Sequence, residues 1–387
     1  MRIRYRVLLL ASARMIVTTG MRMVYPFLAV FARGMGVDLQ AVTLAITVRS
    51  STGLLAPFLA ALVEQWGRKV GLLVGILIIA LSAFIVIIFP TYPAFFTSLI
   101  LSFLGMYIYV SACQAYLGDT VAYEQRGLAM AVVESGWSWS FIIGMPVLAF
   151  LIGRFGWIAP FPLLVVTSLL LAALIWRLLP PSPKDSRAEA TRSNAAQALR
   201  LVFTSPVALT ALAMTVLITA ANEVVVLVFG VWLEDSFGLR LAALGSAAAL
   251  IGVAELTGEL GSGGVIDRLG KKRAVMIGLI VNCLAALALP WMGGKLWSGL
   301  LGLAIFYLSF EFTIISDFTL MTGVMPAARA TLLGSNVAAT WVGRMLGALL
   351  VPTLYEWGFW TNALAALVIN LLAIAVLMRV SIAEEES

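Results

Sequence analysis

The 387-residue sequence contains no histidine and only two cysteines. Without histidine it lacks the most common protein metal ligand and the side chain that titrates most readily near neutral pH. Cys113 and Cys283 lie in separate apolar runs, so neither a disulfide framework nor a thiolate metal site is expected. We therefore expect no bound metal and no other cofactor.

Two further absences narrow the function. No G-x-x-x-x-G-K-[ST] segment is present, so the sequence gives no support for direct use of ATP, and any energy must come from gradients or partners. No nucleophile stands beside a convincing activator, and no histidine base exists, which disfavours an intramembrane hydrolase. We expect that the protein is not an enzyme.

Charge is also scarce, since 11% of the residues are charged and 62% are hydrophobic, against roughly a quarter charged in a soluble domain. Most apolar runs are long enough for a helix to cross about 30 Å of hydrocarbon. The first run is too long for the core of a signal peptide and is read as a retained anchor. Twelve spans are predicted, at about residues 7–32, 41–63, 70–89, 94–116, 129–152, 158–179, 207–233, 242–266, 273–292, 297–322, 331–354 and 359–379.

The net charge of +6 could suggest nucleic acid in a soluble protein, but here the placement of the charges is more informative. With a cytoplasmic N-terminus, the outer loops hold only Arg33, Arg154, Arg240 and Lys295. The inner loops and ends hold Arg2, Arg4, Arg6, Arg68, Lys69, Arg126, Arg177, Lys184, Arg187, Arg192, Arg200, Arg268, Lys271, Lys272, Arg273, Arg329 and Arg379. This bias predicts that both termini are cytoplasmic, and no nucleic acid partner is expected.

The only long polar segment, "PPSPKDSRAEATRSNAAQALR", lies between spans six and seven. It is typical of a cytoplasmic linker with a short surface helix. We predict an N-terminal six-helix bundle over residues 1–180, a linker over 181–206 and a C-terminal six-helix bundle over 207–387, the whole chain being an all-α membrane protein that acts as a monomer.

The two bundles share a repeat. The turns "EQWGRK" and "DRLGKKR" place Gly67 and Gly270 203 residues apart, and the same offset carries Gly75 onto Gly278 and Arg126 onto Arg329. It also carries Gly144 onto Gly347. Agreement at one offset in several spans indicates duplicated halves, which is common among transporters whose halves close alternately around a midplane site.

These turns carry a family resemblance. The segment Gly263-x3-Asp267-Arg268-x-Gly270-Lys271-Lys272 resembles the G-x3-D-R-x-G-R-K signature of the major facilitator superfamily, and "LGDTVAYEQRG" after span four extends the likeness. The earlier copy departs from the signature at Ala60, Glu64 and Gln65. The resemblance implies two pseudo-symmetric bundles of six helices and transport of a small molecule.

The resemblance also implies that the two turns form a latch that closes the cytoplasmic side while the cavity faces outward. Its candidate residues are Glu64, Gly67, Arg68, Lys69, Asp119, Arg126, Asp267, Arg268, Gly270 and Lys271. The alternative is a basic turn that sets topology and has no role in gating. Because the C-terminal copy keeps the full signature, we expect it to be the better ordered of the two.

Motifs of subfamilies are mixed. The segment "ESGWSWSFIIGMPVLAF" resembles the glycine-proline motif of drug and proton antiporters, although Met145 separates Gly144 from Pro146. The arginine that many such antiporters carry in span four would fall near Leu101 and is absent. The segments "FEFTIISDF" and "RATLLGSNVAATWVGRMLGALL" resemble bacterial sugar-efflux permeases.

Charged residues near the centre of a membrane helix cost roughly 2.5–3.5 kcal/mol each on insertion, so they usually face a cavity or a partner. The spans contain Arg14, Arg22, Arg49, Glu134, Glu223, Glu255, Glu259, Glu311, Asp317 and Arg344. In the family, the first, fourth, seventh and tenth helices line the central cavity, which singles out Arg22, Glu223, Glu311 and Asp317. At the depth of Glu311, the opposite half offers Tyr107 and Tyr109.

Arg22 and Glu223 fall at similar depth on equivalent helices, so a charge pair across the cavity is predicted. Burial in a cavity of low dielectric constant favours the neutral acid, so Glu223 and Glu311 are expected to exchange protons without help from histidine. Competition between proton and solute for one carboxylate would give antiport. The alternative for each residue is a permanent ion pair with arginine.

Two other acidic residues in the spans are Glu134 and Glu255. Glu134 lies beside Trp137 and Trp139, where it would serve an inner gate or face the opposing half. Glu255 lies at similar depth to Arg344, and a structural contact between them is predicted.

The preferred function is secondary active transport in the inner or plasma membrane, with efflux of a small amphipathic or organic solute in exchange for protons. The alternatives are a flippase for lipid or lipid-linked sugar and a membrane sensor built on a transporter scaffold.

Overall fold

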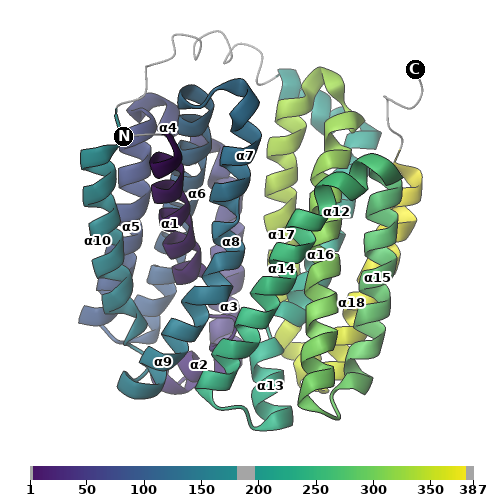
Figure 1. The fold of residues 1–387 in the computed structure, drawn as a ribbon. Coiled ribbons are helices and arrows are strands. Elements are labelled where there is room, and N and C mark those ends of the chain that lie inside the picture. Colours follow the sequence, from purple (N-terminus) through teal and green to yellow (C-terminus); the bar gives the residue numbers. More distant parts are fainter. Residues whose placement is uncertain (1–2, 181–196, 381–387) are drawn as a thin grey trace. The chain divides into compact units, whose positions relative to one another are not determined.

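The computed structural model describes residues 3–180 and 197–380, and the regular structure of these residues is helical throughout (Figure 1). Contacts between residues divide the chain into two compact units. Unit 1 comprises Met1–Asp185 and Leu239–Gly252, and unit 2 comprises Ser186–Gly238 and Val253–Ser387. Most of the predicted linker, residues 181–196, lies outside the described residues, while residues 197–204 are helical.

Unit 1 contains the helices of the first six predicted spans. They are α1 (Ile3–Arg22), α2 (Leu28–Met35), α3 (Leu39–Ser51), η1 (Thr52–Leu55), α4 (Ala56–Trp66), α5 (Arg68–Ile88), α6 (Tyr92–Thr120), α7 (Tyr123–Glu134), α8 (Gly136–Trp139), η2 (Ser140–Gly144), α9 (Met145–Phe155) and α10 (Pro160–Leu178).

Unit 2 contains most of the remaining helices. They are α12 (Pro206–Val226), α13 (Phe229–Phe237), α15 (Lys271–Met292), α16 (Leu296–Val324), η3 (Pro326–Ala328), α17 (Arg329–Tyr355) and α18 (Phe359–Arg379). Helix α14 (Leu241–Leu269) is shared, because its first residues group with unit 1 and the rest with unit 2.

Ten described helices, counting segments that continue across a short break as one, are long and apolar enough to cross a membrane, and the number rises to eleven if one bent pair counts as a span. The difference from the twelve predicted spans lies in the first two. Helix α1 carries four arginines, which lowers its hydropathy below that of the other spans. The bent pair joins Leu28–Met35 to Leu39–Leu55 at an angle of 113°. The all-helical membrane fold is confirmed, and continuous helices over residues 7–32 and 41–63 are not observed.

The first and seventh spans break at equivalent points. The amide of Tyr25 donates to Arg22 three residues back, and 203 residues later the amide of Val228 donates to Val225 in the same way. This change of register leaves the carbonyl that lies four residues back without that backbone donor. In unit 1 the carbonyl of Met21 accepts a hydrogen bond from Arg49 at 2.9 Å.

In unit 2 the equivalent carbonyl belongs to Val224, and it accepts a hydrogen bond from the Asn362 amide at 2.9 Å. The two breaks therefore use the same backbone geometry but take their side-chain donors from different helices, α3 in unit 1 and α18 in unit 2. Pro26 lies within the first break, whereas the second break contains no proline.

The two repeated turns, at Gly67 and at Gly270, also have the same backbone conformation. Gly67 has φ 89° and ψ 150°, and Gly270 has φ 83° and ψ 145°. A residue with a Cβ rarely adopts this region, so glycine is required for so short a link between two helices. The prediction that the C-terminal turn is better ordered stays a prediction, and the backbone of the two glycines is the same.

Small residues bring helices close together at equivalent places, as predicted for Gly75. A Cβ built on Gly75 would lie 2.7 Å from the carbonyl oxygen of Gly105 and 2.9 Å from the Cβ of Tyr109. At the offset of 203, a Cβ on Gly278 would lie 3.2 Å from the Cα of Thr313. In a membrane, such close backbone approach is a main source of helix association.

Candidate functional site

The seam between α12 and α17 contains a buried ion pair. Arg344 Nη1 donates to Glu223 Oε2 at 2.7 Å, with the glutamate side chain fully buried and the arginine side chain 10% exposed. The guanidinium also lies over the rings of Trp341 and Phe310, 5.5 and 5.9 Å from their centroids. Hydrogen bonding, charge and aromatic contact together offset the cost of placing both ions in the membrane.

A second polar layer lies on the same seam, eight residues earlier on both α12 and α17. Thr215 Oγ1 lies 2.8 Å from Asp317 Oδ2 and 2.6 Å from Asn336 Oδ1, and Asn336 Nδ2 lies 3.2 Å from Asp317 Oδ2. All three residues are fully buried. Eight residues of helix span about 12 Å, so the two layers are separate along the seam.

Glycines allow α17 to approach α12 between these layers. A Cβ on Gly347 would lie 2.7 Å from both the carbonyl oxygen of Ala220 and the Cβ of Glu223. A Cβ on Gly343 would clash with Thr219 and with the carbonyl of Val216. The close approach at this glycine pair fixes the distance across which Arg344 reaches Glu223.

Unit 1 has a corresponding seam between α1 and the α7 to η2 segment. Arg14 Nη2 donates to Glu134 Oε2 at 3.0 Å, and Gln114 Nε2 of α6 donates to the other carboxylate oxygen at 3.2 Å. The side chain of Glu134 is 42% exposed, whereas that of Arg14 is 9% exposed. A Cβ on Gly136 would lie 2.8 Å from Arg14 Cγ, so the arginine side chain fits here only because residue 136 is glycine.

Arg22 lies two turns further along α1 and contacts aromatic rings. Its guanidinium is 4.3 Å from the ring centroid of Trp137 and 3.6 Å from that of Phe141, and it donates to the Trp137 carbonyl at 3.1 Å. A guanidinium stacked between two rings is desolvated but keeps favourable electrostatic contacts. The predicted pair between Arg22 and Glu223 stays a prediction, because the two residues belong to different units.

The 203-residue offset relates the two seams with the charges redistributed. Gln114 corresponds to Asp317, and Phe141 corresponds to Arg344. At the depth of Asp317, unit 1 therefore has a carboxylate with a cation, and unit 2 has a carboxyl among neutral groups. At the depth of Arg344, unit 1 has an arginine among aromatic rings, and unit 2 has a complete ion pair.

The other predicted cavity residues are buried within their own units. Glu311 is 7% exposed, and a Cβ on Gly258 of α14 would lie 3.0 Å from its Cβ, so Glu311 lies on the face of α16 that packs against α14. The Tyr107 ring meets Phe103 edge to face at 5.0 Å. The hydroxyl of Tyr109 donates to the Leu10 carbonyl at 2.6 Å. This bond links α6 to α1.

Glu255 is buried, and its predicted contact with Arg344 also stays a prediction. The structure pairs Arg344 with Glu223. Depth alone had pointed to Glu255 as the partner of Arg344.

The predicted latch residues make equivalent contacts in the two units. Arg68 Nε lies 3.3 Å from Asp119 Oδ2, and 203 residues later Lys271 Nζ lies 3.5 Å from Thr322 Oγ1. Each basic residue therefore ties the start of one helix to the last turns of its neighbour, α6 in unit 1 and α16 in unit 2.

The second basic residue of each turn also has a counterpart. Lys69 Nζ donates to the Trp176 carbonyl at 2.7 Å, and Lys272 Nζ donates to the Val380 carbonyl at 2.6 Å. Cations at helix C-termini are favourable because the last carbonyls lack backbone donors. Arg126 makes a similar contact, since its Nε donates to the Val121 carbonyl at 2.9 Å.

The acidic members of the signature are exposed in both copies. Glu64 and Asp267 are on the surface, as is Arg268, and Glu64 and Asp267 make no hydrogen bond or ion pair within the described parts of the chain. Their role in gating stays a prediction, and the contacts of the two copies are comparable.

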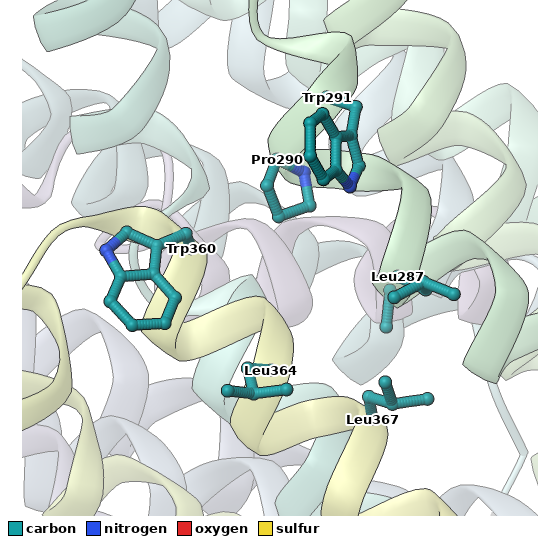
Figure 2. A pocket seen from close by; sticks show the side chains of 7 residues that line it. Leu287, Pro290, Trp291, Trp360, Leu364 and Leu367 are labelled. Carbon is teal, nitrogen blue, oxygen red and sulfur yellow. The ribbon is translucent and has the colours of Figure 1, made fainter.

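An apolar groove opens on unit 2 between the end of α15 and the start of α18, and Figure 2 shows its lining. It is lined by Ala286, Leu287, Pro290, Trp291, Trp360, Leu364 and Leu367. Trp291 is 86% exposed and Trp360 is 53% exposed. The lining offers no charged group, so the groove does not resemble a site for a polar solute.

Sequence reasoning missed Thr215, Asn336 and Gln114. The prediction relied on charged residues in the spans. Uncharged polar side chains are common in membrane helices and do not stand out in the same way. A usable signal was present, since Gln114 occupies the position of Asp317 at the repeat offset. Among the described residues, no group of three or more histidine, cysteine, aspartate or glutamate residues is arranged to hold a metal ion.

Two observations, the helical membrane fold and the repeated seams and turns, agree with a comparison against families. Residues 10–348 match the model of the Major Facilitator Superfamily. The chain belongs to the major facilitator superfamily. It is therefore a multi-pass membrane transporter and not an enzyme, and transporters of this superfamily bind small-molecule substrates in the membrane.

Relatives of this superfamily member occur in Bacillus subtilis (strain 168). The uncharacterized MFS-type transporter YceJ is 27% identical over 232 residues, which is 59% of this chain and 57% of that protein. The uncharacterized MFS-type transporter YwfA is 24% identical over 84% of this chain and 81% of its own length. Multidrug resistance protein 2 is 24% identical over 78% of this chain and 76% of its own length.

Solved structures share the fold. A D-xylose-proton symporter has a TM-score of 0.78 at 15% identity, with 96% of this chain and 97% of that chain covered. A bacterial homologue of the human lysosomal transporter Spinster has a TM-score of 0.72 at 12% identity, with 97% and 94% covered. At such low identity these likenesses describe the fold and say nothing about the substrate.

Proposed function

We propose that this transporter exports a small amphipathic or organic solute by alternating access, in exchange for protons. The observation that carries the proposal is the buried pair of Glu223 and Arg344 at 2.7 Å. Similarity to a protein named Multidrug resistance protein 2 supports the substrate class.

Glu223 is suited to competition because its carboxylate is fully buried and pairs with an arginine on another helix. A proton on Glu223 removes the charge that attracts Arg344, and a cationic solute can replace the arginine as the counter-ion. Proton and solute then exclude one another at one carboxylate, which is the requirement for antiport. Because the group is buried, either one reaches it only when α17 moves relative to α12.

Glu311 is the second carboxylate of this proposal. It lies on α16 against Gly258 of α14, and its burial makes it a group that could exchange a proton when these helices separate. Arg22, Tyr107 and Tyr109 are proposed to contribute to solute binding from the other half, and Glu134 to a gate, with Arg14 as its counter-ion.

The wider organisation is also proposed. Residues 1–180 and 207–387 are the two halves that move relative to one another, joined by residues 181–206. The turns at Gly67 and Gly270 mark the cytoplasmic face, both termini are cytoplasmic, and the protein works as a monomer in the inner or plasma membrane. Equivalent contacts at the 203-residue offset support the duplication, and the distribution of basic residues supports the orientation.

Transport of defined probes separates this function from its alternative. Proteoliposomes with an acidic interior should accumulate ethidium, an amphipathic cation, and Glu223→Gln should abolish the accumulation. Glu356→Gln, an exposed change at the end of α17, is the matched control and should leave it intact. Movement of a fluorescent phospholipid between leaflets without ethidium accumulation would replace the proposal with a flippase.

A further inference from the structure

The layer formed by Thr215, Asp317 and Asn336 has fewer hydrogens than its contacts require. The three side chains come from α12, α16 and α17 and form a triangle of contacts with sides of 2.6, 2.8 and 3.2 Å, in which Asn336 contributes one amide atom to each of its two sides. Each side is within hydrogen-bond distance, so each needs one hydrogen. A threonine hydroxyl has one hydrogen, and an ionised carboxylate has none.

With the Asn336 amide nitrogen facing Asp317, two sides of the triangle join oxygen to oxygen, and Thr215 can supply only one of them. Turning the amide over makes the Thr215 contact an N–H donation but then places the amide oxygen against Asp317. In both orientations one side of the triangle lacks a hydrogen. A hydrogen on Asp317 Oδ2 supplies it and closes a ring in which Asp317 donates to Thr215, Thr215 to Asn336 and Asn336 to Asp317.

Burial supports the same conclusion. Asp317 is fully buried, and its second oxygen, Oδ1, has no hydrogen-bond partner. Within residues 3–180 and 197–380, no cation forms an ion pair with Asp317. An ionised carboxylate that lacks both a counter-ion and a donor on one oxygen would cost several kcal/mol in this setting.

The charged groups on the surrounding helices have other contacts or lie at other depths. On α12 and α17, Glu223 and Arg344 pair with each other about two turns away. On α15, Lys271 reaches Thr322, five residues beyond Asp317 on α16. The remaining charged and titratable groups on α14 to α17 are Glu255, Glu259, Asp267 and Arg268 on α14, Lys272, Arg273 and Cys283 on α15, Tyr307 and Glu311 on α16, and Arg329 and Tyr355 on α17.

Unit 1 provides an internal comparison at the same depth. There the carboxylate is Glu134, and Arg14 and Gln114 each donate to one of its oxygens. Every acceptor of that carboxylate is satisfied without an added proton. In unit 2 the carboxyl group of Asp317 contacts Thr215 and Asn336, which carry no charge, and the missing positive charge leaves a place for a proton.

We propose that Asp317 holds a proton in the conformation described and that Thr215, Asp317 and Asn336 form a proton-binding site separate from Glu223. Loss of the proton breaks the ring, so ionisation of Asp317 and separation of α16 from the α12 and α17 seam occur together. The use of this proton in transport rests on the proposed function, whereas its presence does not.

Infrared spectroscopy of the purified protein tests the presence of the proton directly. With aspartate labelled by carbon-13 at its carboxyl group, the parent at neutral pH should show the carbonyl band of a protonated aspartic acid, shifted by the label and by deuterium oxide. The band should be absent in Asp317→Asn and retained in Glu311→Gln. Asp317→Asn should fold, because the amide group of the new asparagine has two hydrogens. It can donate one to the Thr215 hydroxyl and one to the Asn336 amide oxygen, once the Asn336 amide is turned over.

A second variant keeps the test decisive if Asp317→Asn does not fold. Thr215→Val removes the acceptor of the proposed acidic hydrogen, so the labelled band should move in frequency. The proposal is overturned if the parent shows no protonated aspartate, if the band survives in Asp317→Asn, or if Thr215→Val leaves it unmoved. None of these results depends on transport, so they are distinguishable from failure of the ethidium experiment.

Discussion

Gly347 and Glu223 approach so closely that a Cβ added to the glycine would lie 2.7 Å from the Cβ of the glutamate. This contact sets the spacing of α12 and α17, and the pairing of Arg344 with Glu223 depends on that spacing. The glycine is therefore as much a part of the candidate site as the charged residues are.

Replacing Gly347 with alanine should lower stability. Alanine is favoured over glycine in a helix by about 0.8–1 kcal/mol, but overpacking costs about 1–3 kcal/mol and should prevail here. Thermal unfolding in detergent measures the change. Gly334→Ala is the matched control on the same helix, because a Cβ there meets nothing within 4 Å and should be neutral or stabilising. Equal behaviour of the two variants would contradict the close contact.

The buried pair should show strong energetic coupling. Glu223→Gln leaves the charge of Arg344 buried without its partner, at a cost of about 3–5 kcal/mol. The double variant with Arg344→Gln removes both charges and should be more stable than the sum of the single changes predicts. Thermal unfolding of the four proteins provides the cycle, and additive effects would show that the pair does not act as a unit.

The two helix breaks should respond independently. Arg49→Met removes the donor to the Met21 carbonyl, so hydrogen exchange should rise at residues 23–27 and stay unchanged at residues 226–230. Asn362→Leu removes the donor to Val224 and should produce the converse pattern. The two variants control for one another, and exchange that rises at both breaks in either variant would refute separate local roles.

The two short turns should be equally sensitive to a side chain. Alanine at Gly67 or at Gly270 would have to adopt a conformation that costs about 1–3 kcal/mol. Thermal unfolding should show similar losses for the two variants. Gly118→Ala is a suitable control, since it lies within a helix with open space around a Cβ. A much smaller loss of stability at Gly67 than at Gly270 would show that the two turns differ, as the sequence suggested.

Much of this architecture was accessible from the sequence because its physical signals are strong. Long apolar runs predict membrane helices, and one offset of 203 residues predicts contacts that recur, such as Arg68 with Asp119 and Lys271 with Thr322. Burial of the charged residues in the spans followed from the cost of exposing charge to lipid. The breaks at Tyr25 and Val228 were less accessible, because they depend on donors from distant helices.

The sequence could not show which charged residues pair with one another. Depth placed Arg344 near Glu255, but the rotation of each helix decides which carboxylate it meets, and rotation depends on packing throughout the bundle. The ring around Asp317 was missed for a different reason. Thr215 and Asn336 are uncharged, and only their distances show that the layer lacks a hydrogen.

Proton flux coupled to solute movement tests the central claim most directly. In proteoliposomes that contain a trapped pH-sensitive dye, addition of ethidium to the parent should move protons in the opposite direction to ethidium. Glu223→Gln should abolish this flux, and Glu311→Gln should reduce it, while Glu356→Gln should not alter it. Flux that persists in both Glu223→Gln and Glu311→Gln would contradict the assignment of proton coupling to these carboxylates.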